Sequence, residues 1–247
     1  MLRDLSVQLY TVRKEMSDRE GTLRRIASIG YRAVEPFRPT DDPHGFRALA
    51  DDLGLRVSGA HCALLREDAA PLFEAAKVLG TDHLIVQAAL PHQAFTTREG
   101  IEHIAGRLNA LSRQAAREDL LVGYHNHWWE FEPKIAGRSA MEVLVDLLDP
   151  AVFLEVDTYW AAVAGADVVS VLHTFGERVH ALHVKDGPLV KGEPNTAVGE
   201  GAMPIADIIA AAPQAQLVVE LDSCAGDVMA ALAASHDTLS AMVAGVR

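Results

Sequence analysis

Short, β-rich apolar segments alternate with longer helical segments along the whole of this sequence. Several short segments, such as LIVQAA and LVVEL, are almost wholly apolar, which is typical of strands buried on both faces of a parallel sheet. In the longer segments, Leu, Ile and Ala recur every three or four residues, as an amphipathic helix requires. The predicted strands are Leu5–Val12, Ala33–Phe37, Arg56–His61, His83–Ala88, Leu120–His125, Phe153–Asp157, His180–Val184 and Gln216–Leu221. The clearest predicted helices are Thr22–Ile29, Phe46–Leu53, Ala69–Leu79 and Arg98–Arg117.

Eight strand–helix units in 247 residues predict an α/β fold, a single (β/α)₈ TIM barrel, since such a barrel takes about 250 residues. An open, doubly wound sheet is disfavoured because no GxGxxG turn follows the first strand. No linker, low-complexity tract or block of charge divides the chain. We therefore predict that residues 1–247 form one domain.

The composition narrows the classes of partner. The formal net charge is −12 and the basic residues are dispersed, which argues against a nucleic-acid partner. The sequence has no apolar run long enough for a membrane span, and its charged start lacks the apolar stretch of an export signal. The two cysteines, Cys62 and Cys224, form no CxxC pair. A cytoplasmic protein with no membrane partner is expected.

Each predicted strand carries a polar side chain in or near its last residues. In chain order these are Gln8, Glu35, His61, Gln87, His125, Asp157, His183 and Glu220. A strand buried on both faces has little use for such groups, because an unpaired buried charge is costly. In a closed barrel the strand ends form a ring, so these side chains are expected to meet at its C-terminal mouth, where barrel enzymes build their active sites.

The last four of these residues suggest a metal site. His125, Asp157, His183 and Glu220 offer two imidazoles and two carboxylates, a set suited to one divalent Mn, Zn, Co or Mg ion. Each residue alone has a structural alternative: Asp157 could cap the following helix, and Glu220 could pair with a lysine or arginine. Their coincidence on four successive strands favours the metal site.

The chain resembles the xylose isomerase-like barrels, the sugar isomerase/epimerase superfamily, over nearly its whole length. The resemblance rests on SVQLYTVR, IGYRAVEPF, SGAHC, GYHNHWWEF, EVDTYWAAVAGAD, ALHVKD, VGEG and VVELD. GYHNHWWEF and HVKD are its most specific parts and resemble a subgroup named sugar phosphate isomerase/epimerase. The resemblance implies a small carbohydrate-like substrate and a homo-oligomer, since barrels of this family often associate.

The family holds its metal with Glu, Asp, His and Glu after strands five to eight. The resemblance carries the last three ligands onto Asp157, His183 and Glu220. GYHNH contains no carboxylate, and alternation along the strand points residues 123, 125 and 127 to one side. His125 is therefore the predicted substitute ligand, with His127 and Glu130 as its competitors.

The reactions of the family share one difficult step, the removal of a proton from a carbon beside a carbonyl. We predict a metal-dependent sugar isomerase or epimerase in which the metal stabilises the enediolate. Glu220 is the predicted base, and Glu130 or His127 the opposing acid or base. Lys185 is predicted to stabilise developing negative charge, the alternative being an ion pair with Asp186 or Glu220.

Further residues are predicted to bind the substrate. Glu35, His61 and Gln87 belong to the predicted ring, and Trp128 and Trp160 offer flat apolar faces on which a sugar ring packs.

Two alternatives remain. One is a lyase or dehydratase acting on a keto-sugar, a cyclitol or a 3-keto-glycoside. The other is a non-catalytic carbohydrate-binding barrel, in which the change at strand five has removed the chemistry.

Overall fold

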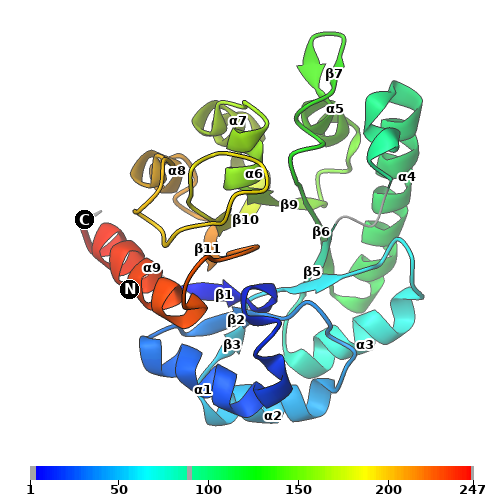
Figure 1. The fold of residues 1–247 in the computed structure, drawn as a ribbon. Coiled ribbons are helices and arrows are strands. Elements are labelled where there is room, and N and C mark those ends of the chain that lie inside the picture. The colour runs from blue at the N-terminus through cyan, green and yellow to red at the C-terminus, as the bar shows by residue number, and fades with distance from the viewer. Residues whose placement is uncertain (1–3, 88–90, 246–247) are drawn as a thin grey trace.

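A parallel sheet forms the centre of the molecule in the computed structural model, which describes residues 4–87 and 91–245 (Figure 1). Within these residues the sheet has nine strands in the order β3-β2-β1-β11-β10-β9-β6-β5-β4. They are β1 (Ser6–Gln8), β2 (Ala33–Glu35), β3 (Arg56–Val57), β4 (Ala60–Cys62), β5 (His83–Val86), β6 (Leu121–His125), β9 (Phe153–Asp157), β10 (Val179–Val184) and β11 (Gln216–Val219).

The two ends of the sheet, β3 and β4, are the two halves of the predicted third strand. Only Ser58 and Gly59 separate them. The Ser58 amide donates to Val34 O at 3.0 Å and the His61 amide to Pro36 O at 2.9 Å, so pairing with the second strand continues past the break. The described strands therefore occupy eight positions in a nearly closed ring, and the predicted (β/α)₈ barrel is confirmed.

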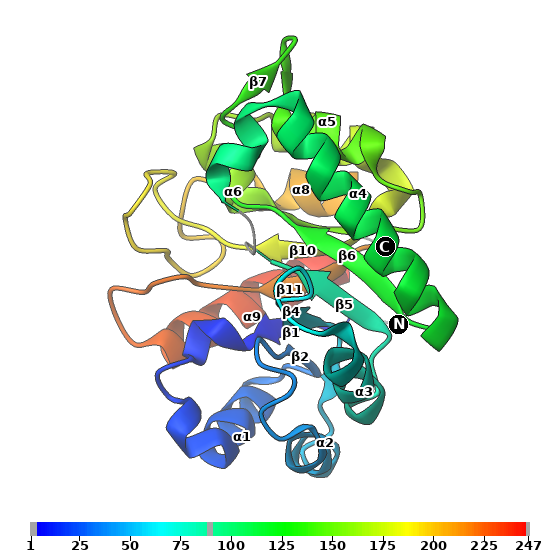
Figure 2. The ribbon, with the colours of Figure 1, turned by 90° about the vertical axis from the view of Figure 1, so that its right-hand side faces the viewer.

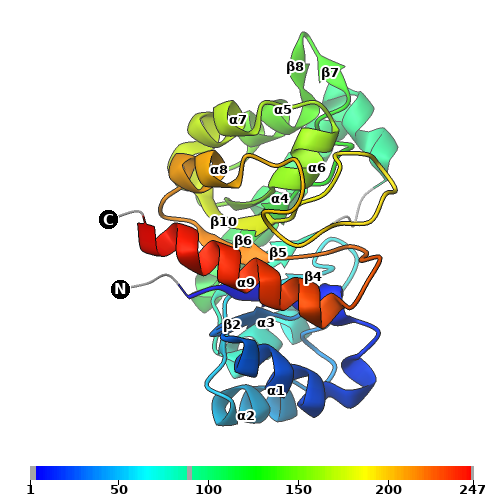
Figure 3. The ribbon, with the colours of Figure 1, turned by 60° about the vertical axis from the view of Figure 1, so that its left-hand side comes forward.

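Helices surround the barrel on its outside (Figures 1 and 2). They are α1 (Arg19–Ile29), α2 (Pro43–Asp52), α3 (Ala69–Leu79), α4 (Arg98–Ala115), α5 (Ala140–Leu147), α6 (Thr158–Val163), α7 (Val168–Phe175), α8 (Ile205–Ala211) and α9 (Val228–Gly245). Figure 3 shows α9 lying across the barrel beside α1, where the buried Tyr31 hydroxyl donates to Leu232 O at 2.9 Å. The last helix thus covers the first strands. Among the described residues, no helix combines the length and hydropathy that a bilayer crossing demands.

The first predicted strand is too long. It ends at Gln8, and Leu9–Val12 forms a 3₁₀ helix because the Gln8 side chain accepts a hydrogen bond from the Tyr10 amide. Leu9 and Val12 are buried, so their apolar character resembled that of a strand. Strands two and eight also end two residues before their predicted limits, at Glu35 and Val219, while Ala88 lies outside the described residues.

Two long loops follow β6 and β10, at the C-terminal ends of these strands. The first contains a small antiparallel hairpin of β7 (Lys134–Ile135) and β8 (Arg138–Ser139), with α5 following directly. The second is held by Asp186, whose carboxylate accepts from the amides of Gly187, Gly199 and Met203 at 2.9–3.0 Å. Three backbone hydrogen bonds to one buried side chain give this loop a defined path.

Gly123 marks a place where the barrel has no room for a side chain. A Cβ there would lie 2.2 Å from a ring carbon of Phe153, which stacks on His180 with a centroid distance of 4.9 Å. We expect Gly123→Ala to lower the free energy of unfolding by about 1–3 kcal/mol, since the ring must leave its position. Gly106→Ala is the control: on the exposed face of α4 its Cβ would meet nothing within 4 Å, and it should raise that free energy by about 0.5–1 kcal/mol. Urea unfolding measures both, and equal effects would contradict the prediction.

Candidate active site

Four buried polar residues meet at the C-terminal ends of β6, β9, β10 and β11. His125, Asp157, His183 and Glu220 each offer a ligand atom, and these atoms all lie within 4.8 Å of one another. His183 Nδ1 is 2.7 Å from Glu220 Oε2, and His125 Nε2 is 3.8 Å from Asp157 Oδ2. The structure thus brings together the residues predicted as metal ligands, and we call them the ligand group.

Strand register explains this meeting. His183 is paired with Asp157 across β10 and β9, and His125 is paired with Glu155 across β6 and β9. Because side chains alternate along a strand, Glu155 and Asp157 point to the same face, the interior of the barrel. The two imidazoles are therefore held at neighbouring levels against two carboxylates of β9.

The residues present fit a divalent metal ion. Imidazole nitrogens and carboxylate oxygens are the ligands that Zn²⁺ and Mn²⁺ take in proteins. Asp157 Oδ2 is buried and, among the described residues, has no aligned hydrogen-bond donor, although the Lys185 ammonium lies 2.8 Å away. Burial, followed by the charge of His183, lowers the pKa of His125 to about 3, so its ring is in the neutral form that binds metals.

Asp157 also fulfils its alternative role. Its Oδ1 accepts a hydrogen bond from the Trp160 amide at 2.9 Å and caps α6. Burial raises the pKa of this carboxyl to about 6. One oxygen serves the helix while the other faces the ligand group.

Lys185 is buried among three carboxylates. Its Nζ lies 2.8 Å from Asp157 Oδ2, 2.7 Å from Glu220 Oε2 and 2.7 Å from Asp222 Oδ2. The ion pair with Glu220 is therefore present, whereas Asp186 is occupied by backbone amides. Burial disfavours the charge of Glu220, but Lys185 and His183 outweigh this and hold the pKa of Glu220 well below its usual range. Glu220 is ionised at neutral pH.

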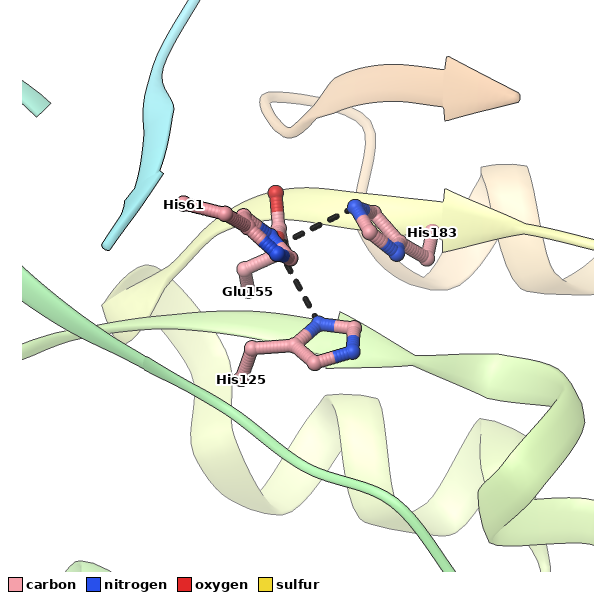
Figure 4. A group of neighbouring side chains, drawn as sticks. All are labelled: His61, His125, Glu155 and His183. Atoms are coloured by element: carbon pink, nitrogen blue, oxygen red, sulfur yellow. Dashed lines mark hydrogen bonds and ion pairs between the residues drawn. The ribbon is translucent and has the colours of Figure 1, made fainter. Parts of the chain in front are cut away.

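Glu155 is the central residue that the sequence prediction missed. It lies in the middle of β9, is fully buried, and with His61, His125 and His183 forms a second group of close ligand atoms (Figure 4). Its Oε2 is 2.6 Å from His61 Nε2. Although burial opposes charge, Glu155 and Glu35 raise the pKa of His61 to about 10. The sequence signal for Glu155 was its position two residues before Asp157, which places both side chains on the same face of the strand. Asp222, which the sequence prediction also missed, lies two residues after Glu220.

A cavity of about 350 Å³ adjoins the ligand group. Its lining residues among those described are Tyr10, His61, Ala63, Arg66, Gln87, His125, His127, Glu220 and Asp222. The volume is in the lower part of the range for small-molecule sites, roughly 300–1,000 Å³. Of the residues predicted to bind substrate, His61 and Gln87 line this cavity, whereas Glu35 is not among its described lining residues and lies 3.0 Å from His183 Nε2. A larger groove, about 930 Å³, borders Tyr10 and Phe37 but contains neither group of ligand atoms.

His127 and Glu130, the competitors of His125 as the metal ligand from the fifth strand, lie in different places in the structure. His127 lines the cavity, stacks on Trp129 with a centroid distance of 4.2 Å, and has a buried Nδ1 without a partner among the described residues. Glu130 is not brought to the ligand group: its oxygens accept from the Tyr124 hydroxyl at 2.7 Å and the His127 amide at 2.8 Å. Because His125 points inward, its neighbour Tyr124 points outward and holds Glu130 behind the strand.

The predicted aromatic binding residues pack on one another. The Trp128 and Trp160 rings lie 4.7 Å apart, and Trp128 also contacts Trp129 edge-on at 4.5 Å. Neither Trp128 nor Trp160 is among the described residues that line the 350 Å³ cavity. Through Trp129, which stacks on the His127 ring, this cluster contacts the edge of the cavity.

Glu130 provides a test of buried charge in this region. Burial raises the pKa of its carboxyl to about 7, above the value of about 4.3 in an unfolded chain. The folded protein then holds this proton at pH values where the unfolded chain has lost it, so stability falls as the pH rises from 4.3 to 7, by on the order of 3 kcal/mol. In Glu130→Gln the amide accepts from the His127 amide and donates to the Tyr124 hydroxyl, so this loss should disappear. Urea unfolding from pH 4.5 to 8 measures the slope, and an unchanged slope in the variant would exclude Glu130 as its source.

Comparisons with known proteins agree on the fold. The family model of xylose isomerase-like TIM barrels matches residues 23–222. The structure is similar to a sugar phosphate isomerase/epimerase from Parabacteroides distasonis, with a TM-score of 0.81 and 22% identity over 98% of this chain and 94% of that one. It is also similar to the probable 3-DHS dehydratase AsbF from Bacillus anthracis (TM-score 0.76, 14% identity, 96% and 98% covered) and to the IOLI protein with a bound zinc atom (0.72, 14%, 98% and 98%). Among curated proteins no relative matches. At these identities the structural likeness shows the fold.

Proposed function

Because the chain belongs to the family of xylose isomerase-like TIM barrels, we propose that it is a divalent-metal-dependent isomerase or epimerase of a small sugar. The observation that supports this most directly is the ligand group, four buried residues from four strands beside a cavity of about 350 Å³. Residues 1–247 would act as one catalytic domain.

The ligand group would hold one Mn, Zn, Co or Mg ion. A bound ion of this kind polarises a carbonyl oxygen and lowers the energy of the charge that develops there. The polar cavity walls, including Gln87, Arg66 and Tyr10, offer donors and acceptors to sugar hydroxyls.

Two residues on different sides of the cavity would move the proton. Glu220 is ionised and lines the cavity, so its carboxylate can accept the proton of a carbon beside the carbonyl. His127 follows β6, three strand positions away from β11, and burial keeps its pKa well below the usual range. Its neutral ring can take up or return a proton on the other side of the substrate. Lys185 holds Glu220 in its ionised form.

Elimination is the second candidate. Glu220 and His127 are chemically unlike, and an unlike pair suits a reaction in which one group removes a proton and the other protonates a leaving oxygen. The structural likeness to a probable 3-DHS dehydratase is compatible with this outcome. A keto-sugar, a cyclitol ketone or a 3-keto-glycoside would then lose water or an aglycone.

Deuterium exchange tests the proposed step directly. The metal-loaded protein is incubated with ketoses, keto-cyclitols and 3-keto-glycosides in D₂O, and the products are analysed by mass spectrometry and NMR. A product that carries deuterium on the carbon beside the carbonyl and is otherwise an isomer of the substrate supports isomerisation or epimerisation. A product that has lost water or an aglycone supports elimination. Glu220→Gln is the control and should exchange roughly 10²–10⁴-fold more slowly. Binding without exchange of any substrate would favour the carbohydrate-binding barrel.

A further inference from the structure

Glu155 has no part in the proton transfer described above, yet it lies at the centre of the buried polar interior. It is fully buried in β9, directly beside His125 in register. Its Oε2 contacts three imidazole nitrogens: His61 Nε2 at 2.6 Å, His125 Nδ1 at 3.1 Å and His183 Nε2 at 3.1 Å (Figure 4). One carboxylate oxygen therefore reaches every histidine of this interior layer.

Each of the two histidines in the ligand group has one ring nitrogen facing a carboxylate of that group and the other nitrogen facing Glu155. His125 directs Nε2 towards Asp157, and His183 directs Nδ1 towards Glu220. The remaining nitrogens, His125 Nδ1 and His183 Nε2, are the ones that face Glu155. In both rings, Glu155 Oε2 thus lies 3.1 Å from the nitrogen that is turned away from Asp157 and Glu220, and Glu35 Oε1 shares the His183 nitrogen at 3.0 Å.

This arrangement has a chemical consequence. A histidine that binds a metal through one nitrogen carries its proton on the other, and a carboxylate that accepts this proton's hydrogen bond fixes the tautomer and the ring orientation. We propose that Glu155 is the shared positioning residue of His125 and His183, setting the tautomer and direction of both at once. The inference rests on the proposed metal-dependent function.

The surroundings hold Glu155 in turn. His61, whose Nε2 contacts Glu155, has its Nδ1 2.9 Å from Gln87 Oε1. Glu35 accepts a hydrogen bond from Gln8 Nε2 at 2.7 Å and lies 3.0 Å from His183 Nε2. The oxygen of Glu155 is therefore anchored on one side by His61 and faces the two ligand rings on the other.

Metal affinity is the first readout. Glu155→Gln keeps the size of the side chain but replaces one acceptor oxygen with a donor, and it should weaken Zn²⁺ and Co²⁺ binding by roughly 10–100-fold. Competition with a chromophoric chelator measures the affinity, and the visible absorption of the Co²⁺-loaded protein should change with ring orientation. Glu130→Gln is the matched control, a second buried carboxylate outside both groups of ligand atoms, and should bind as the parent does.

A second readout needs no metal. Two-bond ¹H–¹⁵N NMR spectra report the tautomer of a neutral imidazole, and that of His125 should change in Glu155→Gln but not in Glu130→Gln. If Glu155→Gln does not fold by circular dichroism, Glu155→Asp is measured instead. It withdraws the acceptor by one methylene and should also weaken binding.

The outcomes separate the inference from the function on which it rests. Parent-like affinity and tautomers in Glu155→Gln would overturn the inference while leaving the metal site intact. Complete loss of binding in Glu155→Gln, with binding retained in Asp157→Asn, would make Glu155 itself a ligand and would also overturn it. A parent protein that binds no ion would refute the proposed function, while the tautomer spectrum of His125 still decides whether Glu155 positions that ring.

Discussion

His183→Ala and Asp157→Asn are expected to lose the bound metal ion and to lower kcat/KM by roughly 10³-fold or more. Each variant removes a buried ligand atom from the ligand group. A metal stabilises the developing charge by several kcal/mol, and a loss of about 4 kcal/mol corresponds to a 10³-fold lower rate. Asparagine is chosen at 157 because it still caps α6, so the loss of the helix cap is separated from the loss of the ligand.

Elemental analysis of the purified proteins measures the bound metal. Activity is measured with the substrate that shows deuterium exchange in the experiment described above. His173→Ala, an exposed histidine of α7, is the control and should keep both metal and activity. About one ion per chain in the parent and none in the two variants is the expected result. A parent without metal, even after ions are added back, would leave the ligand group as a structural ion-pair cluster.

Lys185→Met is expected to lower the free energy of unfolding by about 3–5 kcal/mol at neutral pH. The substitution removes the ammonium that lies within 2.8 Å of Asp157, Glu220 and Asp222, and the first two of these carboxylates are buried. Removing one partner of a buried ion pair leaves the other partner buried with an uncompensated charge, and this costs more free energy than the intact pair contributed. Without Lys185 the pKa values of the Asp157 and Glu220 carboxyls should rise, so the loss is largest at high pH and shrinks as these two groups take up protons at low pH.

Urea unfolding of the chelator-treated proteins at pH 5 and pH 8 tests this prediction. Lys191→Met is the control because Lys191 is half exposed and lies 3.7 Å from Glu132, a surface pair that contributes about 0–1 kcal/mol. A loss as small as that of Lys191→Met, or one that does not depend on pH, would contradict it. Added Zn²⁺ should restore part of the stability of Lys185→Met, since the ion would neutralise the same carboxylates.

Much of the ligand group was predictable from the sequence for a geometrical reason. The ends of parallel strands in a closed barrel must converge, so a polar residue at the end of each of four apolar strands points to a common site. His125, Asp157, His183 and Glu220 were found in this way. The limits of Phe153–Asp157 and Ala69–Leu79 were also predicted correctly, because strong apolar periodicity defines them from end to end.

Other features depended on contacts that local patterns do not contain. Alternation assigns Glu155 to the inner face of β9, but only its register with His125 and the approach of His61 place it in a layer of imidazoles. The loop after β6 has no periodicity, so the path that returns Glu130 to Tyr124 was not predictable from it.

The sequence by itself determined the barrel, the end at which its polar side chains gather, and the chemical types of the side chains in the ligand group. Those properties follow from periodicities of two and of three to four residues and from the cost of burying unpaired polar groups. The tertiary structure alone decided which partners these groups take: Lys185 pairs with Asp157, Glu220 and Asp222, whereas its neighbour Asp186 holds the following loop. The physical reason is that periodicity defines the face on which a side chain lies, while its depth and its partners depend on strand register and loop paths, which long-range packing sets.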